Sequence, residues 1–165
     1  MANKLIPKAN IIIVNKNDEI IGSKERGTLN STDIYRVAAL WLTNSKNEIL
    51  LAQRKFNKVR NPGKWGPAVA GTVEISETYR ECIVREAKEE LGLENIKFTK
   101  IDKQKSTDKN NHFTQWYHTI LDMKIGDFTI QESEVEQIKW FTRDELKKDI
   151  ELHPENYVNA INNFI

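Results

Sequence analysis

Three glutamates near the middle of the chain, Glu86, Glu89 and Glu90, have the residue type and spacing of a cation-binding cluster. A helix turns by about 100° per residue, so Glu86 and Glu90 lie roughly 40° apart, with Glu89 roughly 60° to the other side. All three carboxylates therefore project from a single arc of about 100° on the helix surface. Like charges at this spacing destabilise a helix unless something neutralises them.

Two kinds of partner could neutralise this cluster. Arg85 precedes Glu89 by four residues, which is the spacing of an ordinary salt bridge within a helix. A divalent cation is the stronger alternative, because hard cations such as Mg²⁺ prefer oxygen ligands and clustered carboxylates supply them. A short run of glutamates is by itself more typical of a solvated helix face, so the residues around it decide the interpretation.

The residues on either side extend the cluster into a long pattern. Gly71 is followed after five residues by Glu77, and after seven more by the run Arg85-Glu86-Ala87-Lys88-Glu89-Glu90-Leu91-Gly92-Leu93. Every fixed position of the Nudix signature is matched, so residues 71–93 resemble the signature of the Nudix family. The pattern is long and specific, and the expected order of strands and helices fits the same family over most of the chain.

The resemblance implies a fold, a reaction and a cofactor. Nudix proteins are α/β/α sandwiches in which the signature forms a loop, a helix and a second loop. They hydrolyse a nucleoside diphosphate linked to another group, with Mg²⁺ or Mn²⁺ as cofactor. Metal ions neutralise phosphate oxygens and lower the pKa of a bound water, which attacks phosphorus. The chain is therefore expected to be a metal-dependent Nudix hydrolase whose partner is a small-molecule diphosphate.

The same resemblance assigns roles position by position. Glu86 or Glu89 would handle the proton of the attacking water, and Arg85 and Glu77 correspond to a structural pair that orients the helix. Glycine at position 71 lets the loop backbone approach the site closely. The candidate metal ligands are Glu86, Glu89, Glu90 and the main-chain carbonyl of Ala70 or Gly71.

A strongly basic loop precedes this acidic helix. Residues 52–65 include five basic side chains and no acidic one, whereas residues 71–94 include seven acidic and three basic ones. A basic loop beside a metal-binding helix is typical of a site that holds the outer phosphates of a diphosphate. The candidate phosphate-binding residues are Arg54, Lys58 and Lys64, of which the first two lie closest to the end of a strand.

Aromatic and acidic residues elsewhere supply further candidates. Trp65 and Trp116 are expected to be more open than the other two tryptophans, so that either could contact the substrate. Glu134 is the first candidate for an additional acid from the loop before the last strand, acting as a base or metal ligand. Glu132 and Glu136 stay as alternatives in the same loop.

The residues around the signature indicate one branch of the family. A strand ending in LLAQRK, a basic loop and then PGKWG resemble the isopentenyl-diphosphate-isomerase-like branch. The isomerases have a catalytic cysteine shortly after the PGxW segment, but residues 66–70 contain none, and Cys82 is expected to be a small buried residue. One alternative is therefore an isopentenyl-diphosphate isomerase, which the absent thiol disfavours. A second is a non-catalytic nucleotide-binding Nudix domain, which the complete carboxylate cluster disfavours.

The elements that must position these residues form an α+β sandwich with a mixed sheet. The signature helix is expected over residues 76–91, with Ser76 as a candidate cap and Gly92 at its end. A short helix is expected to start at Thr142 or Arg143 and to run to about residue 152, and a last helix to start at Pro154. A hairpin is expected within residues 11–21, and strands over 37–43, 48–53, 67–73, 96–105, 112–123 and 137–141.

Length and composition set the remaining limits. The 165 residues suit one Nudix domain, 1–165, in which residues 1–34 form an N-terminal hairpin extension. The balance of 25 basic against 24 acidic residues gives no reason to expect a nucleic-acid partner, and no apolar run is long enough to span a membrane. A single cysteine excludes an intramolecular disulfide framework, so a cytoplasmic location is expected. A homodimer is common in the family, although no residue pattern establishes one here.

Overall fold

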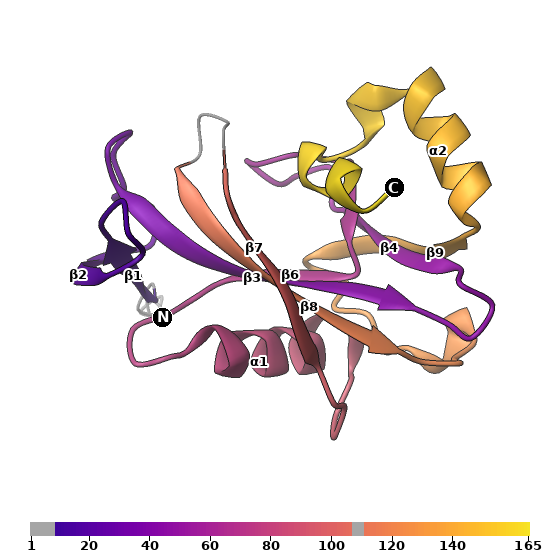
Figure 1. Ribbon diagram of the computed structural model, residues 1–165, viewed down its shortest axis with the longest axis horizontal. Coiled ribbons are helices and arrows are strands. Elements are labelled where there is room, and N and C mark those ends of the chain that lie inside the picture. The colour runs from indigo at the N-terminus through magenta and orange to yellow at the C-terminus, as the bar shows by residue number, and fades with distance from the viewer. Residues whose placement is uncertain (1–8, 107–110) are drawn as a thin grey trace, which may run out of the picture.

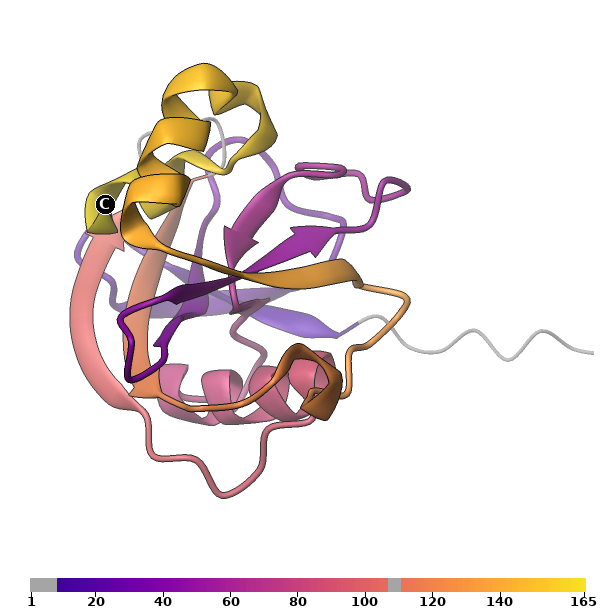
Figure 2. The same cartoon turned by 90° about the vertical axis from the view of Figure 1, so that its right-hand side faces the viewer.

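The computed structural model describes residues 9–106 and 111–165 and has an α+β architecture. A mixed β-sheet forms the middle of the molecule, with helix α1 (Tyr79–Leu91) on one face (Figure 1). Helix α2 (Arg143–Leu152) and the C-terminal segment cover the opposite face, as Figure 2 shows from the side. The α/β/α sandwich expected from the sequence is therefore confirmed. No helix in these two ranges is long and apolar enough to cross a membrane.

The sheet is mixed because one of its central strand pairs is parallel. Strand β3 runs parallel to β8, whereas the other strand pairs of the described residues are antiparallel. Strand β3 also pairs with β1, β4 and β6, so it brings distant parts of the chain to one place. The strands are β1 (Asn10–Val14), β2 (Ile20–Glu25), β3 (Ile34–Thr43), β4 (Ile49–Arg54), β5 (Trp65–Pro67), β6 (Val69–Thr72), β7 (Thr99–Lys105), β8 (His112–Ile120) and β9 (Val135–Phe141).

Strand β3 buries both of its faces, which its continuous apolar run predicts. Ala38, Leu40 and Leu42 belong to the larger core cluster, which includes the buried residues of helix α1. Ala39 and Trp41 belong to a second cluster, formed with residues of α2 and the C-terminal segment. Because successive side chains of a strand point to opposite faces, β3 supports a separate core on each side of the sheet.

Helix α1 begins two residues later than expected from Ser76 as its N-terminal cap. Thr78, rather than Ser76, caps it: the Thr78 hydroxyl accepts a hydrogen bond from the Glu81 N–H, and the Glu81 carboxylate accepts one from the Thr78 N–H. This reciprocal capping box satisfies N–H groups that the start of a helix leaves unpaired. Ser76 instead has a positive φ of 68° and lies outside the helix. The helix ends at Gly92, as expected, with φ at 68°.

The C-terminal segment is the second departure from the expected elements. Helix α2 starts after its Thr142 cap, as expected, but the single helix predicted from Pro154 is wrong. The chain forms two short 3₁₀ turns instead, η2 (Pro154–Asn156) and η3 (Asn159–Phe164), in addition to η1 (Ile125–Asp127). Between η2 and η3 the Val158 N–H donates to the Trp65 carbonyl of strand β5 at 2.9 Å. This bond to a distant strand takes the place of a helical hydrogen bond. The helical spacing of apolar residues in the sequence could not predict it.

Candidate active site

Gly71 and Glu86 form a close contact between strand β6 and helix α1. A Cβ atom added at position 71 would lie 2.1 Å from the carboxyl group of Glu86, which is a severe overlap. Glycine leaves the space that this carboxylate occupies, because it has no side chain. The close approach of the loop backbone that the sequence predicts at this glycine is therefore present.

Arg85 holds the acidic residues of the signature together. Its guanidinium group lies 2.6 Å from Glu77, 2.8 Å from Glu86 and 3.3 Å from Glu89. Burial alone would raise the pKa of Glu77, but the hydrogen bonds from Arg85 and from the Glu74 N–H, together with the nearby positive charges, outweigh this effect and lower that pKa. Arg85 therefore pairs with Glu77, the residue expected, and also restrains two of the candidate metal ligands.

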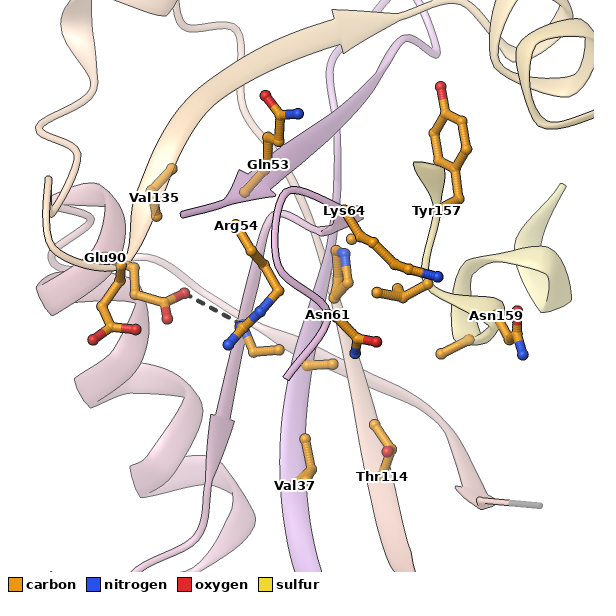
Figure 3. Close-up of a pocket in the computed structure, with 18 of the residues that line it drawn as sticks. Val37, Gln53, Arg54, Asn61, Lys64, Glu90, Thr114, Val135, Tyr157 and Asn159 are labelled. Carbon is orange, nitrogen blue, oxygen red and sulfur yellow. Dashed lines mark hydrogen bonds between the residues drawn. The ribbon is translucent and has the colours of Figure 1, made fainter. Parts of the chain in front are cut away.

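Glu90 faces the other side of the signature loop. Its carboxylate accepts a long hydrogen bond of 3.4 Å from the Ala70 N–H, drawn as a dashed line in Figure 3. The surrounding protein desolvates this carboxyl and, together with the nearby charge of Glu86, raises the pKa of Glu90 to about 8. The pKa of Glu86 is also raised, again chiefly by burial. A cation bound beside these two neighbouring carboxyls would stabilise their charged forms and offset this effect of burial.

The donors at this position suit a hard divalent cation. The carboxylates of Glu86 and Glu90 both approach strand β6, the first at Gly71 and the second at the Ala70 N–H. Such oxygen donors are the ligands that Mg²⁺ and Mn²⁺ take. Within residues 9–106 and 111–165, no three His, Cys, Asp or Glu side chains are already gathered into a metal-binding group, and Glu89 is about half exposed. The residues present therefore match Mg²⁺ or Mn²⁺ in the type of donor atom that they offer. The assignment of metal ligands stays a prediction for Glu86, Glu89, Glu90, Ala70 and Gly71.

A cavity of about 240 Å³ opens beside Glu90. Figure 3 shows Arg54 reaching from the end of strand β4 into the cavity near Glu90, while Lys64 extends toward the C-terminal segment. The charged residues that line the cavity are Arg54, Lys64, Glu90 and Glu134, and the apolar ones include Val37, Ala39, Val135, Val158 and Ala160. Cationic groups beside carboxylates suit a ligand whose phosphates bind metal on one side and guanidinium or ammonium on the other.

Ion pairs attach the basic loop to the start of strand β9 and to the residue just before it. Lys58 lies 2.6 Å from Glu134, and Lys55 lies 3.0 Å from Glu136. The sequence assigns Lys58 to substrate binding and Glu134 to catalysis, whereas the structure brings the two into one ion pair. Lys58 does not line the cavity, but Glu134 does. Glu136 lies within strand β9 and not in the loop before it, and of the three acids considered only Glu134 lines the cavity.

The prediction that Trp116 is open is wrong. Its side chain is 1% exposed, and its ring lies 4.5 Å from Phe164 and 6.5 Å from Trp41, centroid to centroid. Trp116 lines the cavity but is almost fully buried, because the C-terminal segment packs against its face of strand β8. Trp65 is partly exposed and packs edge-on against Phe141, and it is absent from the cavity lining. Substrate contact by either tryptophan stays a prediction.

Sequence reasoning missed the cavity wall formed by the C-terminal segment. The lining includes Tyr157, Val158, Asn159 and Ala160, and Figure 3 shows Tyr157 and Asn159 on the side away from Glu90. Nothing in their types or spacing marks them, because the bond between Val158 and strand β5 places them there. Asn61 also lines the cavity, with φ at 49°, and the Asn-Pro-Gly run is a sequence signal for such a turn.

Cys82 lies beneath the signature loop and away from the cavity. Its side chain is fully buried, and its Sγ atom lies 3.6 Å from the Gly71 carbonyl oxygen. Burial raises the pKa of the Cys82 thiol to about 12. The predicted role as a small buried residue is confirmed, and the chain has no other cysteine that could supply a thiol to the cavity.

Known proteins resemble the chain in sequence and in fold. A prenyl-diphosphate phosphatase from Methanosarcina mazei is 29% identical over 154 residues, which are 90% of this chain and 88% of that protein. An isopentenyl-diphosphate Delta-isomerase from an Enterobacter species is 30% identical over 93 residues, 55% of this chain but only 51% of that protein. The crystal structure of DR0079 from Deinococcus radiodurans matches with a TM-score of 0.75 and 25% identity, covering 87% of this chain and 89% of that one.

The family model of the NUDIX domain matches residues 34–161. That range includes the complete signature, strands β3 to β9 and the wall of the cavity up to Ala160. The chain therefore belongs to the Nudix family, and it is a hydrolase of that family.

Proposed function

We propose that the protein hydrolyses a diphosphate linkage in a small molecule of the nucleoside diphosphate-X type, by attack of water on phosphorus with Mg²⁺ or Mn²⁺ as cofactor. The observation that carries the proposal is the meeting of Glu90 and Arg54 at one cavity. Glu90 supplies a carboxyl group whose oxygens suit a hard cation, and Arg54 supplies a guanidinium group that pairs with phosphate oxygens.

The side chains of the protein have distinct tasks in this reaction. Arg54 would bind and orient a phosphate, because a guanidinium group can donate two parallel hydrogen bonds to it. Arg85 would hold the signature carboxylates in place, and positioning of this kind supplies much of the rate in phosphoryl chemistry. The proton of the attacking water would pass to a carboxylate, for which Glu86, Glu89 and Glu134 are the candidates.

The metal ion would be held by the signature. Glu86, Glu89 and Glu90, with the carbonyl of Ala70 or Gly71, are the residues proposed to hold it. When bound, it would neutralise phosphate oxygens and lower the pKa of a coordinated water.

Glu90→Gln tests the metal assignment directly. The variant removes one negative charge but keeps the shape and a hydrogen-bond acceptor for the Ala70 N–H, so we expect the fold to persist. Hydrolysis should fall by about 100-fold or more, as when another charge-stabilising group is removed from an active site. Chromatography of the reaction products measures activity, and thermal unfolding by circular dichroism measures the fold.

Glu94→Gln is the matched control for this substitution. Glu94 lies just beyond the end of helix α1 and forms an exposed ion pair with Lys88 at 2.9 Å. Its loss should leave the rate of hydrolysis within about twofold of the wild type, because exposed pairs contribute little. Wild-type activity in Glu90→Gln would remove Glu90 from the proposed metal site.

A prenyl diphosphate is the second candidate substrate. The Methanosarcina mazei relative that aligns with most of the chain is a prenyl-diphosphate phosphatase. The apolar part of the cavity, which includes Val37, Val158 and Ala160, offers a surface against which a hydrocarbon chain would pack. The same attack of water on phosphorus would release phosphate from such a substrate.

Isomerisation of isopentenyl diphosphate has less support in the cavity. Moving a double bond requires a proton donor and a proton acceptor on the hydrocarbon. Cys82 is buried on the far side of Gly71, and its raised pKa keeps the thiol protonated and unreactive. We therefore expect no interconversion of isopentenyl and dimethylallyl diphosphate when the products are analysed.

A product screen by anion-exchange chromatography distinguishes these functions, because cleavage of a nucleoside diphosphate-X bridge gives two phosphate monoesters and frees no inorganic phosphate. The panel would contain nucleoside triphosphates, dinucleotide polyphosphates, nucleotide sugars, ADP-ribose and isoprenoid diphosphates, each with Mg²⁺ and then with Mn²⁺. Product formation that stops when a chelator removes the metal would support the proposed hydrolysis and identify the substrate class. Binding of a nucleotide without any product would contradict it and favour a non-catalytic binding domain.

A further inference from the structure

The N-terminal hairpin, defined as residues 10–25 with strands β1 and β2, lies outside the residues that the family model matches. Strand β1 nevertheless runs along the chain that leads into helix α1 (Figure 1). The Ile12 N–H donates to the Val73 carbonyl at 3.3 Å, and the Ile75 N–H donates to the Asn10 carbonyl at 2.8 Å. The hairpin is therefore bonded to the connecting segment, residues 73–78, which joins strand β6 to the signature helix.

Asp18, in the turn of the hairpin, provides a second attachment at the first residue of helix α1. The Tyr79 hydroxyl donates to the Asp18 carboxylate at 3.1 Å, Arg36 of strand β3 donates to it at 2.7 Å, and Lys103 of strand β7 also pairs with it. Arg36 and Lys103 each lie 5.0 Å from the centroid of the Tyr79 ring. With partners from three elements, the Asp18 side chain is only 8% exposed.

A series of ion pairs provides the third attachment. Arg26, which follows strand β2, lies 3.6 Å from Glu74 of the connecting segment, and Glu74 lies 4.0 Å from Arg85. Arg85 in turn contacts the carboxylates of the candidate active site. These pairs are partly exposed, so they orient side chains more than they stabilise the fold.

From these three attachments we propose that the hairpin is a positioning element for catalysis. It contacts the start of the connecting segment at Glu74 and the first residue of helix α1 at Tyr79, and so sets the rotation and axial position of that helix. Each helical residue turns by about 100° and rises about 1.5 Å, so a small slip of the first turn moves every carboxylate of the signature. Misplacement of a catalytic group by about 1 Å can cost about 100-fold in rate. The inference rests on the proposed hydrolysis, and Asp18 is its principal residue because it contacts Tyr79 itself.

Comparison of Asp18→Asn with Asp33→Asn tests this role. Asparagine keeps the shape of Asp18 and tolerates its positive φ of 62°. Asp33 is a matched control: its side chain is 9% exposed, and it pairs with Lys24 of strand β2 at 2.8 Å. Its other hydrogen bond comes from the Asn30 N–H, so its partners lie outside the connecting segment and helix α1.

We expect Asp18→Asn to lower kcat about tenfold with little change in KM, and Asp33→Asn to change neither. Both variants are assayed at a temperature at which circular dichroism shows them folded. Tyr79→Phe, which removes the hydroxyl but keeps the ring, should lower kcat in the same direction by a smaller factor. An equal loss of kcat in Asp18→Asn and Asp33→Asn would overturn the proposal, because a purely stabilising hairpin would respond to both.

Amide hydrogen exchange in the metal-free protein gives a second measurement that does not depend on activity. Asp18→Asn should speed exchange over residues 79–86, and Asp33→Asn should not. Unchanged exchange there in Asp18→Asn would also overturn the proposal. If the wild-type protein hydrolyses no member of the substrate panel, the proposed function fails, while the exchange result still decides whether the hairpin positions helix α1.

Discussion

At the scale of single residues, Ser76 is the clearest conflict between a side chain and its backbone. Of the described residues other than glycine, the positive φ angles belong to Asp18, Asn47, Asn61, Ser76 and Asn95. Asn and Asp adopt the left-handed region readily because their short polar groups bond locally, whereas serine at 68° is strained. The strain costs about 1–2 kcal/mol. The connecting segment thus includes a strained residue just before the helix cap.

Ser76→Gly should raise the free energy of unfolding by about 0.5–1 kcal/mol, because the relief of strain exceeds the extra chain entropy that glycine loses on folding. The same change at Ser23, within strand β2 and outside the positive-φ set, should lower it by about the same amount. Urea unfolding of both variants measures the difference. A loss of stability in Ser76→Gly would show that the serine side chain contributes a contact larger than its strain.

Arg54 is the cation whose role is most directly testable, because it reaches the cavity beside Glu90. Arg54→Ala should raise KM about tenfold or more, since a hydrogen bond to a charged group contributes roughly 1.5–3 kcal/mol, and should change kcat less. Lys55→Ala is the control from the same loop, because Lys55 pairs with Glu136 and lies outside the cavity lining. Initial rates over a range of substrate concentrations give both constants. An unchanged KM in Arg54→Ala would argue against phosphate binding by this loop.

At the scale of elements, the local sequence specifies where helix α1 begins and ends, but not how the helix is placed in the fold. Its bounds follow from local signals, a capping box at Thr78 and Glu81 and a left-handed Gly92. Its placement depends on distant residues, because Asp18 and Tyr79 are far apart in the chain and no spacing rule relates them. The carboxylates of the signature are therefore readable from sequence, but the contacts that orient them are not.

The docking of the hairpin should also appear in the acid stability of the protein. Burial would raise the pKa of Asp18, but the hydrogen bonds from Lys103 and Arg36 and the positive charges of both groups together outweigh it and hold that pKa below the ordinary value of 3.8. A carboxyl with a lowered folded-state pKa stabilises the fold above its unfolded-state pKa, and the contribution disappears as the pH falls through the folded-state pKa. Wild-type stability should therefore drop between about pH 4 and pH 2 more steeply than that of Asp18→Asn.

Urea unfolding at pH 7 and at several lower pH values measures this difference. Asp18→Asn should be less stable than the wild type at pH 7, and the two should approach each other in acid. If the free energies of unfolding of the two proteins change in parallel with pH, the ion pairs of Asp18 with its cationic partners do not stabilise the fold.

At the scale of the whole molecule, the sequence predicts those parts that short-range patterns encode. The signature at residues 71–93, the cap of helix α2 at Thr142 and the double-sided burial of strand β3 all follow from neighbouring residues. The position of Trp116 does not, because its burial depends on which elements cover strand β8. The same holds for Val158, whose bond to strand β5 closes the cavity from the far end of the chain. Composition and periodicity do not predict these contacts between distant segments, because the topology of the sheet determines them.

The contact between Gly71 and Glu86 has a consequence for the natural variation of such proteins. A variant in which only Gly71 is replaced would keep every glutamate of the signature, yet its new side chain would occupy the space of one of them. Loss of activity during evolution can therefore begin at a signature position that has no reactive group of its own. A survey that counts intact acidic residues would count such a lineage among working enzymes. A residue other than glycine at position 71 would therefore indicate an inactive member of the family before any glutamate is lost.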